Sequence, residues 1–276
     1  MAQQTARAPR TLATLAGAVL ALPLLASSGP AQEGLAELNQ TGACVACDLR
    51  LVTLRGVEIQ GADLTRAILR EADMKEVVLP DGKFAKADLR RAELERADLR
   101  RSDFSGASMR AVDMEKADLS GAVLDGADLR DADLNGTSLA GARFAGADLR
   151  NASLIRAAAT GAAFRNAKMD GADLERADLS GADFSGARLP YSDLDRVRAA
   201  GASFRGADLT GVRLSSADLS GADLSGADMT DTLLRNTRLP GADLTGVKGL
   251  DPRRIIDACG DAQTKLPVGI VLKPCS

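Results

Sequence analysis

The chain of 276 residues contains no histidine, no tryptophan and a single tyrosine. Histidine is the side chain that general acid–base catalysis uses most often, and it is a common zinc ligand. The sequence also contains no phosphate-binding loop, nucleophile elbow or metal-ligand spacing. These absences predict a protein that is not an enzyme and that holds no cofactor or metal.

Long apolar runs are equally scarce, and the one such run lies at the N-terminus. It spans Thr11–Ala26, follows a basic start, and precedes small residues that suit cleavage after Ser28 or Ala31. A disordered or membrane-anchoring tail is the alternative, but this run is interrupted by Pro23 and is short for a bilayer span of about 20 residues. The run predicts a signal peptide over residues 1–31 and export, most simply to a bacterial periplasm, with no stable membrane insertion after cleavage.

What the sequence does contain is a five-residue repeat over residues 47–247. Every fifth residue from Leu49 to Leu244 is large and apolar except Ala159 and Ala199, and a small residue, usually alanine, stands two positions earlier. A period of five fits neither an α-helix nor a flat strand, because the apolar residues would then point in different directions. The chain must therefore turn within each pentad and wind into a solenoid, with its apolar residues along one axis and Gly, Asp and Asn at the turns.

Phenylalanine indicates how many pentads make one coil. All six phenylalanines occupy the central position of a pentad and differ by multiples of twenty: Phe84, Phe104, Phe144, Phe164, Phe184 and Phe204. Chance placement among four columns would produce this roughly once in a thousand cases. Four pentads therefore form one coil, the phenylalanines stack in one column of the core, and about ten coils spaced by about 4.8 Å give a rod about 48 Å long.

The order of a small residue, Asp or Asn, Leu or Phe, and two variable residues resembles the pentapeptide repeat protein family. The resemblance covers residues 47–247, and Ala-Asp-Leu-Ser-Gly at 117–121 illustrates it. It implies an all-β fold, a right-handed quadrilateral β-helix with four pentads per coil. Some members of the family resemble DNA in shape and charge and bind type II topoisomerases, which is the alternative function for this chain.

The two ends of such a solenoid expose core residues and unpaired strand edges, so a cap is expected at each. Residues 32–46 form the predicted N-terminal cap, with a short helix over Glu33–Thr41 that lays Leu35 and Leu38 on the first coil. Residues 248–276 form the predicted C-terminal helical cap, which is held by a disulfide.

The C-terminal cap carries explicit helix signals. Asp251 is the expected N-cap, Pro252 the first helical residue and Gly260 the stop, with Ile255 and Ile256 on the buried face. The segment that follows is expected to lie across the last coil through Val268, Ile270 and Leu272.

The four cysteines flank the repeats, with Cys44 and Cys47 before the first coil and Cys259 and Cys275 after the last. A disulfide needs Cα atoms within about 7 Å, and the two ends of the rod lie much farther apart. Pairing is therefore expected within each end. Haem attachment would require histidine after Cys47, where Asp48 stands, and zinc would require further ligands. A redox dithiol at Cys44 and Cys47 is the remaining alternative to a structural disulfide.

The outer surface shows a pattern of arginines spaced by twenty residues. We call this column, which places one arginine on the same edge of six successive coils, the arginine stripe: Arg50, Arg70, Arg90, Arg110, Arg130 and Arg150. Unit charges about 4.8 Å apart repel by about 0.9 kcal/mol even in water, so neighbouring carboxylates are expected to offset them: Asp48, Asp88, Asp128 and Asp148. One interpretation is a solvated edge of mixed charge. The other is a surface that binds an acidic partner, either a protein or an anionic envelope polymer.

Net charge gives no sign of a nucleic-acid or membrane partner. The chain carries −3, and loss of Arg7 and Arg10 with the signal peptide lowers this to −5, with both signs interspersed. A DNA mimic would be dominated by acidic faces, whereas this chain has columns of arginine. Because the filled axis leaves no pocket, any function must lie outside. The main hypothesis is a non-enzymatic exported scaffold or binding rod, whose partner and oligomeric state the sequence does not indicate.

Overall fold

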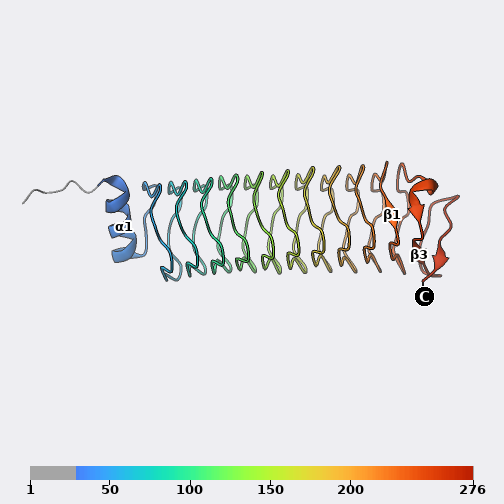
Figure 1. Cartoon of the computed structure of the whole chain (residues 1–276), viewed down its shortest axis with the longest axis horizontal. Helices are drawn as coiled ribbons and strands as arrows, with labels where there is room; N and C mark the ends of the chain where they lie inside the picture. The colour runs from blue at the N-terminus through green and yellow to red at the C-terminus, as the bar shows by residue number, and fades with distance from the viewer. Residues whose placement is uncertain (1–28, 276) are drawn as a thin grey trace, which may run out of the picture.

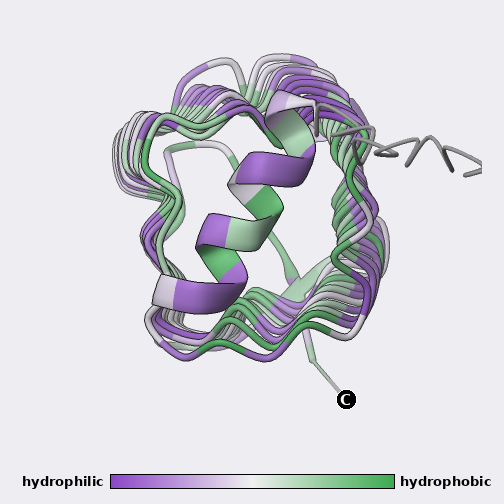
Figure 2. Ribbon diagram, turned by 90° about the vertical axis from the view of Figure 1, so that its left-hand side faces the viewer, coloured by the Kyte–Doolittle hydropathy of each residue, from purple (hydrophilic) through white to green (hydrophobic). Residues whose placement is uncertain are grey.

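The computed structural model of the chain describes residues 29–275, which form a rod of stacked coils (Figure 1). Parallel bridges join residues that are twenty apart, such as Asp63 and Lys83, from the first coil to the last. Viewed along the rod, the coils superimpose on a roughly square outline (Figure 2). The prediction of four pentads per coil is therefore confirmed.

Regular strands are short throughout the described residues. They are β1 (Leu234–Arg235), β2 (Ile255–Ile256), β3 (Cys259–Gly260) and β4 (Lys273–Pro274), paired in parallel as β1 with β2 and β3 with β4. Elsewhere each pentad contributes a single bridging residue, because a turn follows directly. The all-β expectation needs this correction: the walls are ladders of bridges and turns, not extended strands.

Each turn is closed by the backbone and capped by aspartate. In one example the amide of Ala67 donates to the carbonyl of Leu64 at 3.0 Å, and the intervening Arg66 has a φ of 59°. The carboxylate of Asp63 accepts from the amide of Thr65 at 3.1 Å, which satisfies a turn donor. The expected capping role of aspartate is confirmed, and the left-handed corner accepts arginine as well as glycine.

The interior is a continuous apolar column. All central residues of the pentads from Leu49 to Leu244 are buried except Ile59, which is partly buried. Within the predicted phenylalanine column, neighbouring rings stack with centroids 4.6–5.0 Å apart, and Leu124 interrupts the stack. Where a hydroxyl replaces the buried alanine, it donates to a carbonyl of the preceding coil, as do Ser102, Thr137, Ser192, Thr232 and Thr237.

The N-terminal cap is the helix α1 (Pro30–Thr41), which lies across the open end of the rod (Figure 2). Leu38 is fully buried and Leu35 is partly buried against the core, as predicted. The helix ends at Gly42, whose φ of 72° suits the left-handed C-cap. It begins earlier than expected, at Pro30, within the segment 1–31 that was predicted to be a signal peptide, most of which lies outside the described residues.

The prediction of a helical C-terminal cap is wrong beyond its first turn. Asp251 does cap a turn, accepting from the amide of Arg253 at 2.9 Å, but the 3-10 helix η1 (Pro252–Arg254) ends there. Ile255 and Ile256 then form β2 against β1, and the expected stop, Gly260, lies in β3. Leu272 packs on the core and Ile270 is partly buried, whereas Val268 is fully exposed, so only part of the last segment covers the final coil.

Candidate anion-binding surface

The six arginines of the stripe lie on one edge of the rod. The residues two positions before them form an unbroken chain of parallel bridges, from Asp48 through Ile68, Asp88, Ser108 and Asp128 to Asp148. Each stripe arginine directly follows a buried central residue and stands at the corner of its coil. Their side chains are 37–56% exposed, so every guanidinium group reaches the solvent.

Four of the six are held by the aspartate two residues earlier, as the sequence predicted. Arg90 donates from Nε and Nη2 to the two carboxylate oxygens of Asp88, both at 2.7 Å. The same two-point contact joins Arg130 to Asp128, and it recurs in the pairs Arg50–Asp48 and Arg150–Asp148. These pairs offset the repulsion between neighbouring arginines.

Arg70 and Arg110 have no such aspartate, because Ile68 and Ser108 occupy the corresponding positions. Both arginines reach into the next coil instead. The Nε of Arg70 donates to Asp88 at 2.6 Å, so that one carboxylate serves two arginines. The Nε of Arg110 donates to Asp131 at 3.1 Å.

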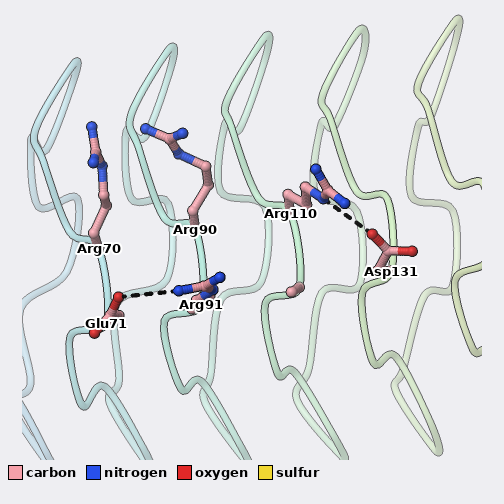
Figure 3. A pocket seen from close by; sticks show the side chains of 7 residues that line it. Arg70, Glu71, Arg90, Arg91, Arg110 and Asp131 are labelled. Carbon is pink, nitrogen blue, oxygen red and sulfur yellow. Dashed lines mark hydrogen bonds and ion pairs between the residues drawn. The ribbon is translucent and has the colours of Figure 1, made fainter.

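A hollow of about 420 Å³ lies at this part of the stripe, and its lining comes from both sides of the corner: Arg70, Glu71, Arg90, Arg91, Arg110, Ala111 and Asp131 (Figure 3). In the figure Arg70 and Arg90 extend in the same direction, while Arg91 turns to Glu71 and Arg110 to Asp131. A smaller hollow of about 250 Å³ shares Arg110 and Asp131 and continues past Arg150. The two form one groove along the stripe.

The local electrostatics follow from the ion pairs. Hydrogen bonds from Arg90 and then Arg70 hold the pKa of Asp88 at about 2, against the opposing effect of burial. Arg130 lowers the pKa of Asp128 in the same way, and Arg150 lowers that of Asp148. These carboxylates therefore remain ionised at any pH at which the protein is expected to function.

Acid titration should reveal the contribution of Asp88. Its native pKa of about 2 lies below the usual value of about 3.9, so its stabilising effect is fully present above about pH 4 and is lost as the pH falls through about 2. We expect Asp88→Asn to be less stable than the wild type at about pH 6 and equally stable near pH 2. Urea unfolding followed by circular dichroism measures both, and a pH-independent difference would contradict the assignment.

The structure brings each predicted cysteine pair to disulfide distance. The Cα atoms are 5.5 Å apart for Cys44 and Cys47, and 4.8 Å apart for Cys259 and Cys275. Cys44 and Cys259 are buried, one at each end of the core. Among residues 29–275, no group of three or more acidic or cysteine side chains is placed to hold a metal ion, and no helix is long and apolar enough to cross a bilayer.

The sequence reasoning found the stripe but missed the second wall of the hollow. Glu71, Arg91 and Asp131 belong to the neighbouring column, one residue further along each turn, and their charges were visible at the same spacing of twenty. The signal that was overlooked is the absence of aspartate at positions 68 and 108, which sends Arg70 and Arg110 across to other coils.

Comparison with known sequences identifies the family. The pattern described as pentapeptide repeats matches eight copies, over residues 47–81, 83–126, 117–154, 160–190, 177–215, 192–231 and 213–248. Because these segments cover well over half of the chain, it belongs to the pentapeptide repeat family. A comparison with curated proteins found no significant match.

Several solved structures are similar. HetL, a pentapeptide repeat protein involved in heterocyst differentiation regulation in the cyanobacterium Nostoc sp. strain PCC 7120, is 31% identical over 78% of this chain and 87% of its own, with a TM-score of 0.35. QnrB1, a plasmid-mediated fluoroquinolone resistance protein, is 19% identical over 80% of this chain and 94% of its own, with a TM-score of 0.48. A pentapeptide repeat protein from the thylakoid lumen of Arabidopsis thaliana is 31% identical over 38% of this chain and 66% of its own, with a TM-score of 0.14.

Proposed function

We propose that this chain is a non-catalytic, exported rod that binds an acidic partner, a protein or an anionic envelope polymer, through the arginine stripe. The proposal takes the coil to be the right-handed quadrilateral β-helix of the family and takes both cysteine pairs to be structural disulfides. The filled core supports a non-catalytic role, because the axis holds buried side chains where a substrate pocket would otherwise lie.

The groove along the stripe is the observation that carries the proposal. Exposed edges of mixed charge are common and need no function, but this edge combines an aligned column of arginines with the hollow at Arg70, Arg90 and Arg110. Guanidinium groups present several donors in a fixed plane, which suits carboxylate and phosphate oxygens. A DNA mimic would require carboxylates, not arginines, to dominate such a column.

Replacing Arg90, Arg110 and Arg130 together with serine should weaken salt-dependent binding to a soluble polyanion, such as polyphosphate, by about tenfold or more at low salt. The matched control replaces Arg96, Lys116 and Arg176 with serine, which removes the same charge from a different corner of the coils. Surface plasmon resonance across a salt series measures both. Unchanged binding by the stripe variant, or an equal loss in the control, would reject the stripe as the binding surface.

Export is part of the proposal, and the start of α1 suggests where the signal peptide is cut. Gly29 is the N-cap of α1 and Pro30 its first residue, so cleavage after Ser28 keeps the whole helix, whereas cleavage after Ala31 removes its beginning. We therefore propose a mature chain that starts at Gly29. Mass spectrometry of the protein purified from the periplasm tests this, and an intact N-terminus would argue against export.

A further inference from the structure

The positive charge of the stripe is concentrated at the hollow. Four guanidinium groups face three carboxylates there, with Arg70, Arg90, Arg91 and Arg110 on one side and Glu71, Asp88 and Asp131 on the other. Further along, Arg130 and Arg150 each have an aspartate of their own, and Asp170 is held by Arg188. A surplus of one positive charge therefore remains at the hollow, while the rest of the groove is balanced.

The hydrogen-bonding capacity of the arginines is distributed in the same way. Arg130 and Arg150 each use Nε and Nη2 on an aspartate. The side chains of Arg70 and Arg110 use only Nε in the hydrogen bonds made within the described part of the chain, so that both terminal nitrogens of each are left for a ligand. Arg70 and Arg90 lie on adjacent coils and extend in the same direction (Figure 3), so they can grip one ligand group together.

A ligand at this place must compete with carboxylates that the fold holds in position. A single carboxylate or a phosphodiester brings one negative charge and gains little over Asp88 and Asp131. A phosphate monoester brings a charge of about −1.5 to −2 at neutral pH and three strong acceptor oxygens, which can bridge guanidinium groups of neighbouring coils.

We infer that the anion site of the stripe is the cluster Arg70, Arg90 and Arg110, and that it takes a phosphate monoester group of the partner. The inference rests on the proposed function, which requires only that the stripe bind an anionic partner. It adds that Arg130 and Arg150, although equally aligned, contribute little, because their donors are committed to Asp128 and Asp148.

Two double variants test this assignment because each removes the same charge from the same edge. Arg70→Ser with Arg110→Ser should weaken the binding of inorganic phosphate at about pH 8 by about tenfold or more, and Arg130→Ser with Arg150→Ser by less than about twofold. Serine occurs naturally at this place in the pentad, as at Ser120 and Ser180, so both variants should fold. Titration at fixed ionic strength, followed by nuclear magnetic resonance of the arginine Nε–H groups, measures the affinities.

A third variant adds a carboxylate without removing an arginine. Ser108→Asp gives Arg110 the aspartate that Arg130 has, and it should weaken phosphate binding severalfold. Acetate and dimethyl phosphate should bind the wild type at least about tenfold more weakly than phosphate. Equal losses in the two double variants, or acetate binding as tightly as phosphate, would overturn the inference but leave stripe binding intact. If the wild type binds neither phosphate nor polyanions, the proposed function fails as well.

Discussion

Replacing Phe164 with alanine should lower the free energy of unfolding by about 3–5 kcal/mol. The ring is fully buried and lies 4.8 Å from the ring of Phe144 and 4.7 Å from that of Phe184, centroid to centroid. Alanine would leave a cavity in the axis, and the neighbouring coils cannot close it, because their backbones are fixed by parallel bridges on every side. Two stacked contacts, each worth about 0.5–1.5 kcal/mol, are also lost.

Two controls separate the cavity from the stacking. Phe164→Leu should cost less than about 1.5 kcal/mol, because Leu124 already occupies this column between Phe104 and Phe144. Phe84→Ala should cost less than Phe164→Ala, since Phe84 has one stacked neighbour and not two. Guanidinium unfolding followed by far-ultraviolet circular dichroism gives all three values. A cost below about 1.5 kcal/mol for Phe164→Ala would mean that the column is not tightly packed.

The coil was predictable because its constraint is local and repeated forty times. A pentad with one large apolar residue can bury it only by turning, and the spacing of the phenylalanines by twenty fixes the number of turns per coil. The stacked rings and the bridges between residues twenty apart confirm that reasoning. What periodicity could not show is how little extended backbone each side contains, since it locates the turns but does not give the length of a strand.

The C-terminal cap was mispredicted because a tertiary contact outweighs a local signal. Asp251 and Pro252 are genuine helix-starting residues, and they do begin one turn. The last coil, however, offers the unpaired edge of β1, and the β-branched pair Ile255 and Ile256 is better suited to that edge than to a helix. Local propensity decided the first three residues, and strand pairing decided the rest.

The stripe was predictable as a column but not as a site. Spacing by twenty aligns all six arginines, and aspartates two residues earlier were expected to neutralise them. The hollow arises where that rule fails, at Ile68 and Ser108, because Arg70 and Arg110 then find partners in other coils. Side-chain choices of this kind depend on the three-dimensional positions of Asp88 and Asp131, which no linear pattern specifies.

Replacing Cys259 and Cys275 with serine should remove about 3 kcal/mol of stability, because their disulfide closes a loop of 16 residues. The same change at Cys44 and Cys47, which are three residues apart, should cost only about 1.5–2 kcal/mol on the same chain-entropy argument. For a chain of this size, about 3 kcal/mol corresponds to a fall in the melting temperature of roughly 6–12 °C. Thermal unfolding of the two double variants under oxidising conditions tests the ranking.

The loss should also be localised, because a solenoid is stabilised by contacts between neighbouring coils. The cross-link holds β4 on β3, and β3 in turn covers the last full coil, where the amide of Leu239 donates to the carbonyl of Cys259 at 2.8 Å. Without it, β4 should separate first and expose that layer. Hydrogen exchange is therefore expected to rise around Leu239 and Leu244 in the Cys259→Ser, Cys275→Ser variant, while amides near Phe144 keep their protection. Uniformly faster exchange along the rod would instead indicate that the coils unfold as one unit.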